Sequence, residues 1–352
     1  MNLQKPNSPK IKNNFIYLSV LIFAFLTFVF INRQSLFIKF GPNLINNYLR
    51  SQDILDTENK IKDRILISDS DIYIASGYMY ANGIDPRKYN FQHPPFIKYL
   101  FGLSSKYFNL PLLPNIFFAG FLILGVYLLG INVFKNPTIG FLASILLMFD
   151  PVFKEVTIYA LLDLGQIVFI LWFLIISLFY PKHYLIEGIL LGLALASKFW
   201  TPVLIFLGIL YIYKLLVMKI NIKNELIILF IAFLTFCLTY VVSFIKSDGL
   251  FNIFFWQAKL LKFMLEHNVA TKWGSTLKMF FGGYLLWPII FFVNLYLLFK
   301  TKIKEVKFLI YLLPILYLFL LTFQLSFTRY FILILPFLYL SLGKFVVSKL
   351  KK

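Results

Sequence analysis

The sequence predicts an all-α polytopic membrane protein, and three observations support that fold class. Hydrophobic side chains make up 60% of the 352 residues, charged side chains only 14%, and the mean hydropathy is +0.81. Apolar runs long enough to cross a bilayer recur along the chain, and 43 phenylalanines exceed what a soluble core of this size needs. The basic residues behind the net charge of +19 lie in short clusters between these runs. This is the pattern of cytoplasmic loops in membrane proteins, so nucleic-acid binding is not expected.

The first apolar run, residues 15–32, follows a polar segment and is long enough to span the hydrocarbon at about 1.5 Å per residue. Because it lacks a small-residue cleavage site, we interpret it as a retained signal anchor. Residues 33–112 are then expected to form a large outer loop with amphipathic helices in the interface, at residues 37–55 and 94–108.

Nine further spans are expected after this loop, which makes ten, or eleven if part of the loop inserts. A second outer loop, residues 246–282, separates the seventh span from the eighth. No internal repeat or soluble segment is visible, so residues 1–352 are predicted to form a single domain. The expected spans after the first loop are 113–133, 138–150, 157–180, 184–197, 200–217, 224–245, 283–299, 306–323 and 328–347.

Lysine placement predicts the orientation of the chain. With ten spans and both termini in the cytoplasm, the lysine-rich segments 1–14, 214–224, 300–307 and 344–352 all fall inside. Both long loops then fall outside and carry most of the aspartates. The short outer turns hold only Lys154, Lys198 and Arg329. A phosphate in the outer headgroup region would explain cations there, and snorkelling to the interface is the alternative.

The most polar and turn-rich stretch is residues 68–100, which begins with Asp69 and Asp71. At a spacing of two, both acids face one pocket if the segment is extended or a turn. Such a carboxylate can act as a general base or bind a divalent cation, so a divalent cation stays an open expectation. The alternative is a solvated loop whose aspartates cap helices.

His93-Pro94-Pro95 predicts the start of an interfacial helix, because proline is favoured in the first turn. His93 is a candidate for orienting a phosphate or a carboxylate, although a lone histidine is more often structural. Asp163 is expected about two turns inside the outer end of the span 157–180, where it needs a partner. It marks either a helix–helix hydrogen bond or an acceptor cavity.

The second outer loop combines His267 with several tryptophans, and Trp287-Pro288 follows it. Aromatic side chains at this depth usually anchor the interface, and they also stack on sugar rings. The single cysteine, Cys237, excludes an internal disulfide and a cysteine metal site, and no cluster has metal-ligand spacing. Nucleotide-binding and hydrolase motifs are absent, so the sequence predicts no particular organic cofactor.

The order of these features resembles the membrane-embedded C-type glycosyltransferases. Within them it resembles the protein O-mannosyltransferase and aminoarabinose-transferase-like group, which uses lipid-phosphate-linked sugars. Asp69, Tyr73 and the element HPPFIK at 93–98 match the order of that group's first outer loop. Ser70 stands where the group has a glutamate, and Asp71 is the candidate substitute. Weaker matches to the group run through the chain: DPVFKEVTIYALLD (150–163), GLALASKFW (192–200), WP (287–288) and TRYFILILP (328–336). The segment 150–163 lacks the arginine that the group usually has near its end.

The resemblance implies inverting transfer of a sugar, a hexose such as mannose, from a polyprenyl-phosphate donor on the outer face of the cell membrane. Asp69, with Asp71 beside it, would be the catalytic acid-base candidate. Lys198, Arg329 and His93 would neutralise the lipid phosphate. The acceptor, whether protein, lipid or glycan, and the sugar would meet Tyr73, Asp163, His267 and Trp287.

Two other function classes stay open at this point. A transporter or flippase of lipid-linked saccharides is the main alternative, but it would usually show repeated halves and broken helices near the midplane. A membrane scaffold without catalysis is the other. The large acid-bearing outer loop favours an enzyme.

Overall fold

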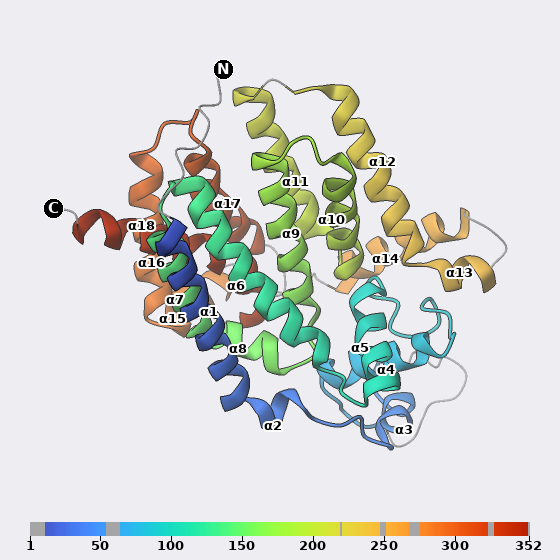
Figure 1. The fold of residues 1–352 in the computed structure, drawn as a ribbon. Coiled ribbons are helices and arrows are strands. Elements are labelled where there is room, and N and C mark those ends of the chain that lie inside the picture. Colours follow the sequence, from blue (N-terminus) through green and yellow to red (C-terminus); the bar gives the residue numbers. More distant parts are fainter. Residues whose placement is uncertain are drawn as a thin grey trace.

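The computed structural model describes residues 11–53, 64–218, 220–246, 251–267, 275–322 and 327–350. Within these ranges every named element is a helix (Figure 1), and the one β-type pairing is an isolated bridge between Ser51 and Ile65. In chain order the helices are α1 (Ile11–Ile31), α2 (Arg33–Leu36), α3 (Leu44–Leu49), α4 (Asp69–Ala81), α5 (Phe96–Phe108), α6 (Leu113–Phe134), α7 (Pro137–Met148), α8 (Pro151–Ile158), α9 (Leu162–Phe179), α10 (Tyr184–Ser197), α11 (Thr201–Val217), α12 (Ile222–Leu238), α13 (Val241–Lys246), α14 (Phe251–His267), α15 (Ser275–Gly283), α16 (Leu286–Phe299), α17 (Val306–Leu321), the 3₁₀ helix η2 (Thr328–Leu333) and α18 (Leu335–Leu350).

Three helices of the described chain, α1, α6 and α9, are long and apolar enough to cross a membrane by themselves. α15 and α16 pass the same test as a pair bent by 105°, and α7, α10, α11 and α17 are shorter apolar helices. The all-helical class is therefore confirmed for the described residues. The predicted count of ten or eleven spans is not.

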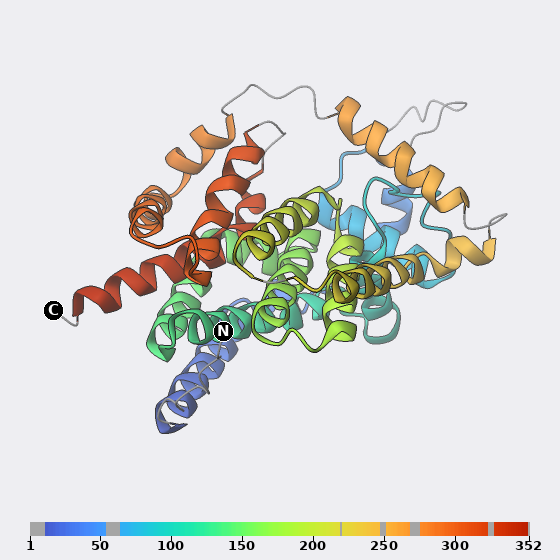
Figure 2. The same cartoon turned by 90° about the horizontal axis from the view of Figure 1, so that it is seen from above.

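The helices pack around a core formed by α6, α7, α9, α10 and α18. Figure 2 shows α1 and α14 on opposite sides of this core. α1 packs mainly against α7 and buries Leu21, but many of its large apolar side chains point away from the protein: Phe23 is 73% exposed. An apolar helix with an exposed apolar face suits a lipid environment rather than water.

Several boundaries differ from the sequence prediction. The span expected at 157–180 begins only at Leu162, because residues 151–158 form the separate helix α8. The span expected at 224–245 breaks after Leu238 into α12 and α13. The last one opens as η2 and becomes α-helical at Leu335. The interfacial helix expected at 37–55 is reduced to α3, whereas α5 matches its prediction.

α4 and α5 pack against each other in the first loop, and two glycines allow their backbones to touch. A Cβ atom on Gly77 would lie 2.0 Å from the carbonyl oxygen of Lys98, and one on Gly102 would lie 1.9 Å from that of Gly77. Only glycine permits such an approach. The contact fixes the start of α4 relative to the segment that leads into α5.

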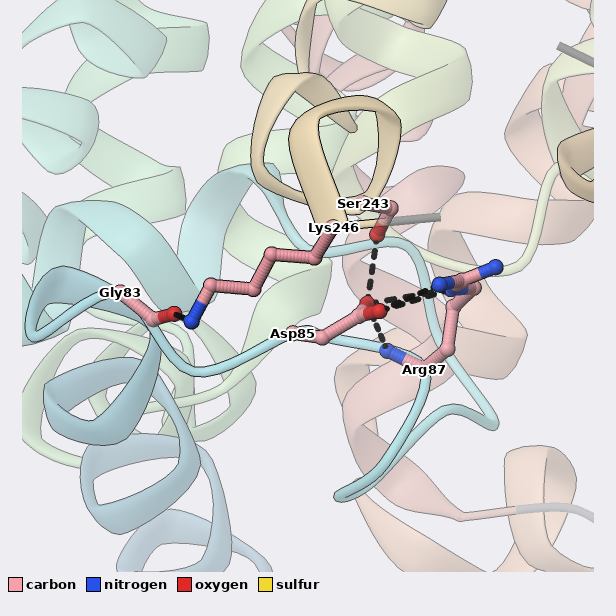
Figure 3. A network of polar contacts seen from close by, with 5 residues as sticks. All are labelled: Gly83, Asp85, Arg87, Ser243 and Lys246. Carbon is pink, nitrogen blue, oxygen red and sulfur yellow. Dashed lines mark hydrogen bonds and ion pairs between the residues drawn. The ribbon is translucent and has the colours of Figure 1, made fainter. Parts of the chain in front are cut away.

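A second set of contacts joins this loop to α13 (Figure 3). Asp85 accepts hydrogen bonds from the backbone and guanidinium of Arg87 and from Ser243 Oγ at 2.7 Å, and Lys246 donates to the carbonyl of Gly83. Burial raises the pKa of Asp85, but these hydrogen bonds outweigh it and hold that pKa below its ordinary value. The two loops predicted to lie outside are thus linked directly.

Figure 1 shows α2, α3, α4 and α8 at one end of the bundle, and the connections α9–α10 and α11–α12 at the other. The second end carries Lys182, Lys214 and Lys223. Basic connections and acid-bearing loops therefore lie at opposite ends, as the lysine pattern predicts. Which end faces the cytoplasm stays a prediction.

Candidate active site

Four charged side chains from distant parts of the chain meet at the α4 and α8 end of the bundle. Lys198 Nζ lies 2.5 Å from Asp163 Oδ1, and an Arg329 guanidinium nitrogen lies 2.5 Å from Asp69 Oδ2. Arg329 Nε is also 3.8 Å from Asp163 Oδ2, so the two pairs form one network. The Asp163 side chain is only 2% exposed, whereas that of Asp69 is 42% exposed. The network thus has a buried side and an open side.

Asp69 is the first residue of α4, and its placement follows from the N-cap. Ser68 has an extended backbone, and its Oγ accepts a hydrogen bond from the backbone N–H of Asp71 at 3.1 Å. Ser68 Oγ also donates to Asp71 Oδ2 at 2.8 Å. Asp71 is thereby engaged at the helix cap. The expectation of an extended or turn segment is wrong, and the helix turns the two acids to different faces.

Asp163 lies in the first turn of α9, not two turns inside a span, because α8 is a separate helix. Two side chains hold the link between α8 and α9. Asn115 Nδ2 donates to the carbonyls of Val156, Thr157 and Tyr159 at the end of α8, where backbone carbonyls lack helical partners. Ser70 Oγ accepts from the backbone N–H of Ala160 at 2.9 Å. Ser70 therefore ties the start of α4 to the link that carries Asp163.

Lys198 follows the last residue of α10, where the backbone becomes extended. Its Nζ lies 4.1 Å from the centroid of the Tyr330 ring, a cation–π contact beside the ion pair. Gln166 Nε2 of α9 donates to the carbonyl of Phe199 at 3.1 Å and holds this segment in place. Arg329 is carried by η2, whose Phe331 is fully buried and packs against Phe280 with 5.1 Å between ring centroids.

Tyr73 and His93 lie beside the network, in an edge-on contact with 5.9 Å between ring centroids. Burial, and the cations Lys198, Lys98 and Arg329, lower the pKa of His93 well below its ordinary value. His93 is therefore neutral, so it can offer hydrogen bonds but not the positive charge expected of it from the sequence. Burial and Asp69 raise the pKa of Tyr73, so its phenol stays protonated.

Lys98, the last residue of the HPPFIK element, is fully buried. Its Nζ donates to the carbonyls of Asn90 at 2.6 Å and His93 at 2.8 Å and to Asn90 Oδ1 at 3.0 Å. Burial lowers its pKa to about 7, although Asp53 acts in the opposite direction. Lys98 thus positions the loop that carries His93.

The other two predicted site residues have different surroundings. Trp287 Nε1 donates to Asp150 Oδ2 at 2.9 Å, and Tyr339 donates to the same oxygen at 2.7 Å. Asp150 also caps α8 by accepting a hydrogen bond from the backbone N–H of Val152. Trp287 therefore holds the residue that caps the start of that helix. His267 ends α14, and its side chain lies outside the described residues.

One acid beside the network was not selected from the sequence. Glu155 lies on α8, and its Oε2 accepts a hydrogen bond from Thr328 Oγ1 at 3.3 Å. Thr328 precedes Arg329, so Glu155 belongs to the same surface. Its position inside DPVFKEVTIYALLD was the available signal, but the break between α8 and α9 hides its relation to Asp163 from any helical periodicity.

The site is better suited to an anion than to a metal ion. In the described part of the chain, no group of three or more His, Cys, Asp and Glu side chains is placed to hold a metal. Arg329 Nε is buried, lies 3.8 Å from Asp163 Oδ2 and forms no hydrogen bond with any described residue, so its N–H has no acceptor at hydrogen-bond distance in the described part of the chain. A phosphate oxygen is a strong acceptor for such a donor.

Comparison with solved structures identifies the class of fold, an all-helical membrane-protein architecture. It is similar to that of ArnT from Cupriavidus metallidurans bound to undecaprenyl phosphate (TM-score 0.67, 14% identity) and to ArnT from the same organism in the apo state (TM-score 0.61, 16% identity). In both cases the match covers 93% of this chain and 59% of the ArnT chain. This likeness shows a shared fold.

No protein-family model and no curated protein matches this sequence. Activity, donor and acceptor therefore have to be argued from the residues of this chain.

Proposed function

We propose that this protein is a membrane glycosyltransferase that moves a sugar from a polyprenyl-phosphate donor to an acceptor on the outer face of the membrane. The observation that carries the proposal is the convergence of Lys198 and Arg329 with Asp69 and Asp163 at one end of the bundle. These residues come from four separate segments. They lie in a fold similar to that of a protein crystallised with undecaprenyl phosphate.

The two cations are suited to the donor phosphate. Lys198 is held by Asp163 on the buried side, and Arg329 Nε, 3.8 Å from Asp163 Oδ2, forms no hydrogen bond with any described residue. Preorganised donors of this kind stabilise the charge that collects on a leaving phosphate without any rearrangement during the reaction. His93 adds a neutral hydrogen-bonding group beside them.

Asp69 is the candidate base. One of its oxygens contacts Arg329, which orients the carboxylate, and the side chain is 42% exposed. In the proposed step an acceptor oxygen bonds to the anomeric carbon and its proton passes to Asp69. The bond between that carbon and the phosphate oxygen breaks, and polyprenyl phosphate leaves with the electron pair. A single displacement of this kind inverts the anomeric centre.

The resemblance in the sequence makes a hexose, with mannose first, the donor sugar to try. Tyr73 is the residue of the predicted sugar and acceptor pocket that adjoins the network directly, because its ring contacts His93 and its pKa responds to Asp69. Asp163 forms an ion pair with Lys198, and this contact favours a positioning role for Asp163.

The test uses membranes that contain the wild-type protein, Asp69→Asn or Glu266→Gln, incubated with radiolabelled undecaprenyl-phosphate mannose and then with other undecaprenyl-phosphate hexoses. Wild type should transfer label, and Asp69→Asn should be slower by about a thousandfold, the usual contribution of a positioned base. Glu266 is an exposed acid on α14 that pairs with Lys262, so its substitution is the matched control. Equal labelling by wild type and Asp69→Asn, or none with any donor, would contradict the proposal.

The 105° bend between α15 and α16 favours a transporter of lipid-linked saccharides, because transporters use broken helices. The two functions differ in their products. A transporter leaves the bond between sugar and phosphate intact, so movement of intact donor without any new glycoside would establish the alternative.

A further inference from the structure

Glu155 differs from the other two acids of the site in its partners. Asp69 contacts Arg329, and Asp163 contacts Lys198 and Arg329. Glu155 forms no ion pair within 4 Å among the described residues, and the hydrogen bond from Thr328 Oγ1 is its side-chain contact. It is nevertheless close enough for Arg329 to lower its pKa and for Asp163 to raise it. Burial is the largest influence and leaves that pKa above its ordinary value.

The site therefore has two cations, Lys198 and Arg329, on one side and the carboxylate of Glu155, unpaired among the described residues, on the other. When a donor phosphate occupies Lys198 and Arg329, both cations are in use. Glu155, which is partly exposed on α8, then remains as a carboxylate without a cation. An anionic acceptor entering beside it would meet like-charge repulsion in a partly desolvated place. A neutral group with a polar hydrogen would instead find a strong hydrogen-bond acceptor.

We propose that Glu155 determines the class of acceptor: it accepts a hydrogen bond from a neutral, hydroxyl-bearing acceptor and excludes a phosphate as the nucleophile. The inference rests on the proposed function and specifies the second substrate of the same site. The acceptor hydroxyl oxygen bonds to the anomeric carbon, polyprenyl phosphate departs with the electrons of the broken bond, and the hydroxyl proton goes to Asp69. Glu155 binds a neighbouring polar hydrogen of the acceptor and so holds the nucleophile in line.

The product of the wild-type protein tests the acceptor class directly. Native membranes of the source cells supply the acceptor, and radiolabelled undecaprenyl-phosphate hexose supplies the sugar. After unreacted donor has been removed by chromatography, the product is treated with mild acid. A sugar on a hydroxyl is a glycoside and keeps its label, as we expect, whereas a sugar on a phosphate releases it. Release of the label would overturn the inference while leaving the glycosyltransferase proposal intact.

Variants of Glu155 and of its partner test whether Glu155 binds the acceptor. With donor in excess, Glu155→Gln should need about tenfold more acceptor membrane for half-maximal rate, which corresponds to one charge-assisted hydrogen bond. The ratio of sugar transfer to slow hydrolysis of donor by water should fall in this variant, because Glu155 is proposed to bind the acceptor and not the donor phosphate. Thr328→Val, which frees Glu155 from its partner, should show a smaller shift in the same direction, and Glu266→Gln should show none.

Two results would count against Glu155. The inference fails if Glu155→Gln titrates with acceptor membrane as wild type does, or if it loses donor hydrolysis in the same proportion as transfer. A wild-type protein that transfers no sugar at all would instead overturn the proposed function. The failures of the two proposals are therefore distinguishable.

Discussion

Two buried ionic networks lie at opposite ends of this protein, and they are built differently. At one end, Lys198 and Arg329 meet Asp69 and Asp163. At the other end, Lys214 Nζ lies 3.5 Å from Glu187 Oε1 and 3.0 Å from Glu225 Oε1. Both networks place cations against carboxylates in a chain that is otherwise largely apolar.

The second network is local. Its members come from three consecutive helices, α10, α11 and α12, and Tyr211 donates to Glu225 Oε2 at 2.7 Å. The side chains of Glu187, Lys214 and Glu225 are 2%, 7% and 16% exposed. A network that neighbouring helices complete among themselves is suited to joining those helices.

The first network is assembled from segments as far apart as residues 69 and 329, its Asp69 side chain is 42% exposed, and Arg329 Nε forms no hydrogen bond with any described residue. Long-range assembly with unsatisfied groups is costly for stability alone, and such features concentrate at functional sites. We therefore expect the first network to serve the proposed chemistry and the second network to stabilise the fold.

Of the substitutions that test this difference between the two networks, Arg329→Gln should have the largest effect. Sugar transfer should fall by about a hundred- to a thousandfold, because a preorganised donor to the leaving phosphate is lost. Folding should survive, since Asp163 keeps Lys198 and Asp69 reaches solvent. The measurements are the transfer rate and the thermal unfolding midpoint in detergent. Arg329→Lys keeps the charge and should be intermediate, and a variant with full activity would remove Arg329 from the site.

Lys214→Met should give the opposite pattern. Removing the cation leaves Glu187 buried with no ion partner among the described residues, which should destabilise the protein by about 3 kcal/mol. The folded fraction should transfer sugar at the wild-type rate. Thermal unfolding in detergent and the rate per folded molecule separate the two effects, and Lys214→Met/Glu187→Gln should recover part of the stability. A large loss of rate with unchanged stability would reverse the assignment.

His93 provides the smallest expected effect, through pH. Its pKa in the folded protein is depressed by burial, Lys198, Lys98 and Arg329, so below pH about 6.5 the unfolded chain binds a proton that the folded protein does not. Stability should therefore fall on acidification by at most about 1.4 kcal/mol per pH unit from this residue. His93→Gln should lessen that fall. The check is the unfolding midpoint at neutral and acidic pH, and parallel curves for both proteins would contradict it.

Much of the site was predictable because charge in an apolar chain is conspicuous. Asp163, Lys198 and Arg329 were selected as charges near the outer ends of apolar runs and Asp69 as an acid of the long outer loop, and the structure joins the four by ion pairs. The pairing itself was not predictable, because partners 35 and 260 residues apart share no local pattern.

Asp71 shows why local geometry matters as much. Two acids at a spacing of two share a face in an extended segment and diverge in a helix. Because Ser68 caps a helix at this point, Asp69 reaches Arg329 and Asp71 turns back to the cap. Glu155 was missed for a related reason, since the break after α8 removes the periodicity that would have linked it to Asp163.

The sequence by itself determined the all-helical class, the alternation of apolar runs with basic clusters, and the identity of the exceptional charges. Hydrocarbon tolerates few charges and demands paired backbone groups, so composition alone imposes these features. Only the tertiary structure decided which charges meet, which acid stays without a cation, and which cluster is confined to neighbouring helices. Those outcomes depend on helix breaks and on contacts between distant segments, where small differences in packing decide which side chains come within reach.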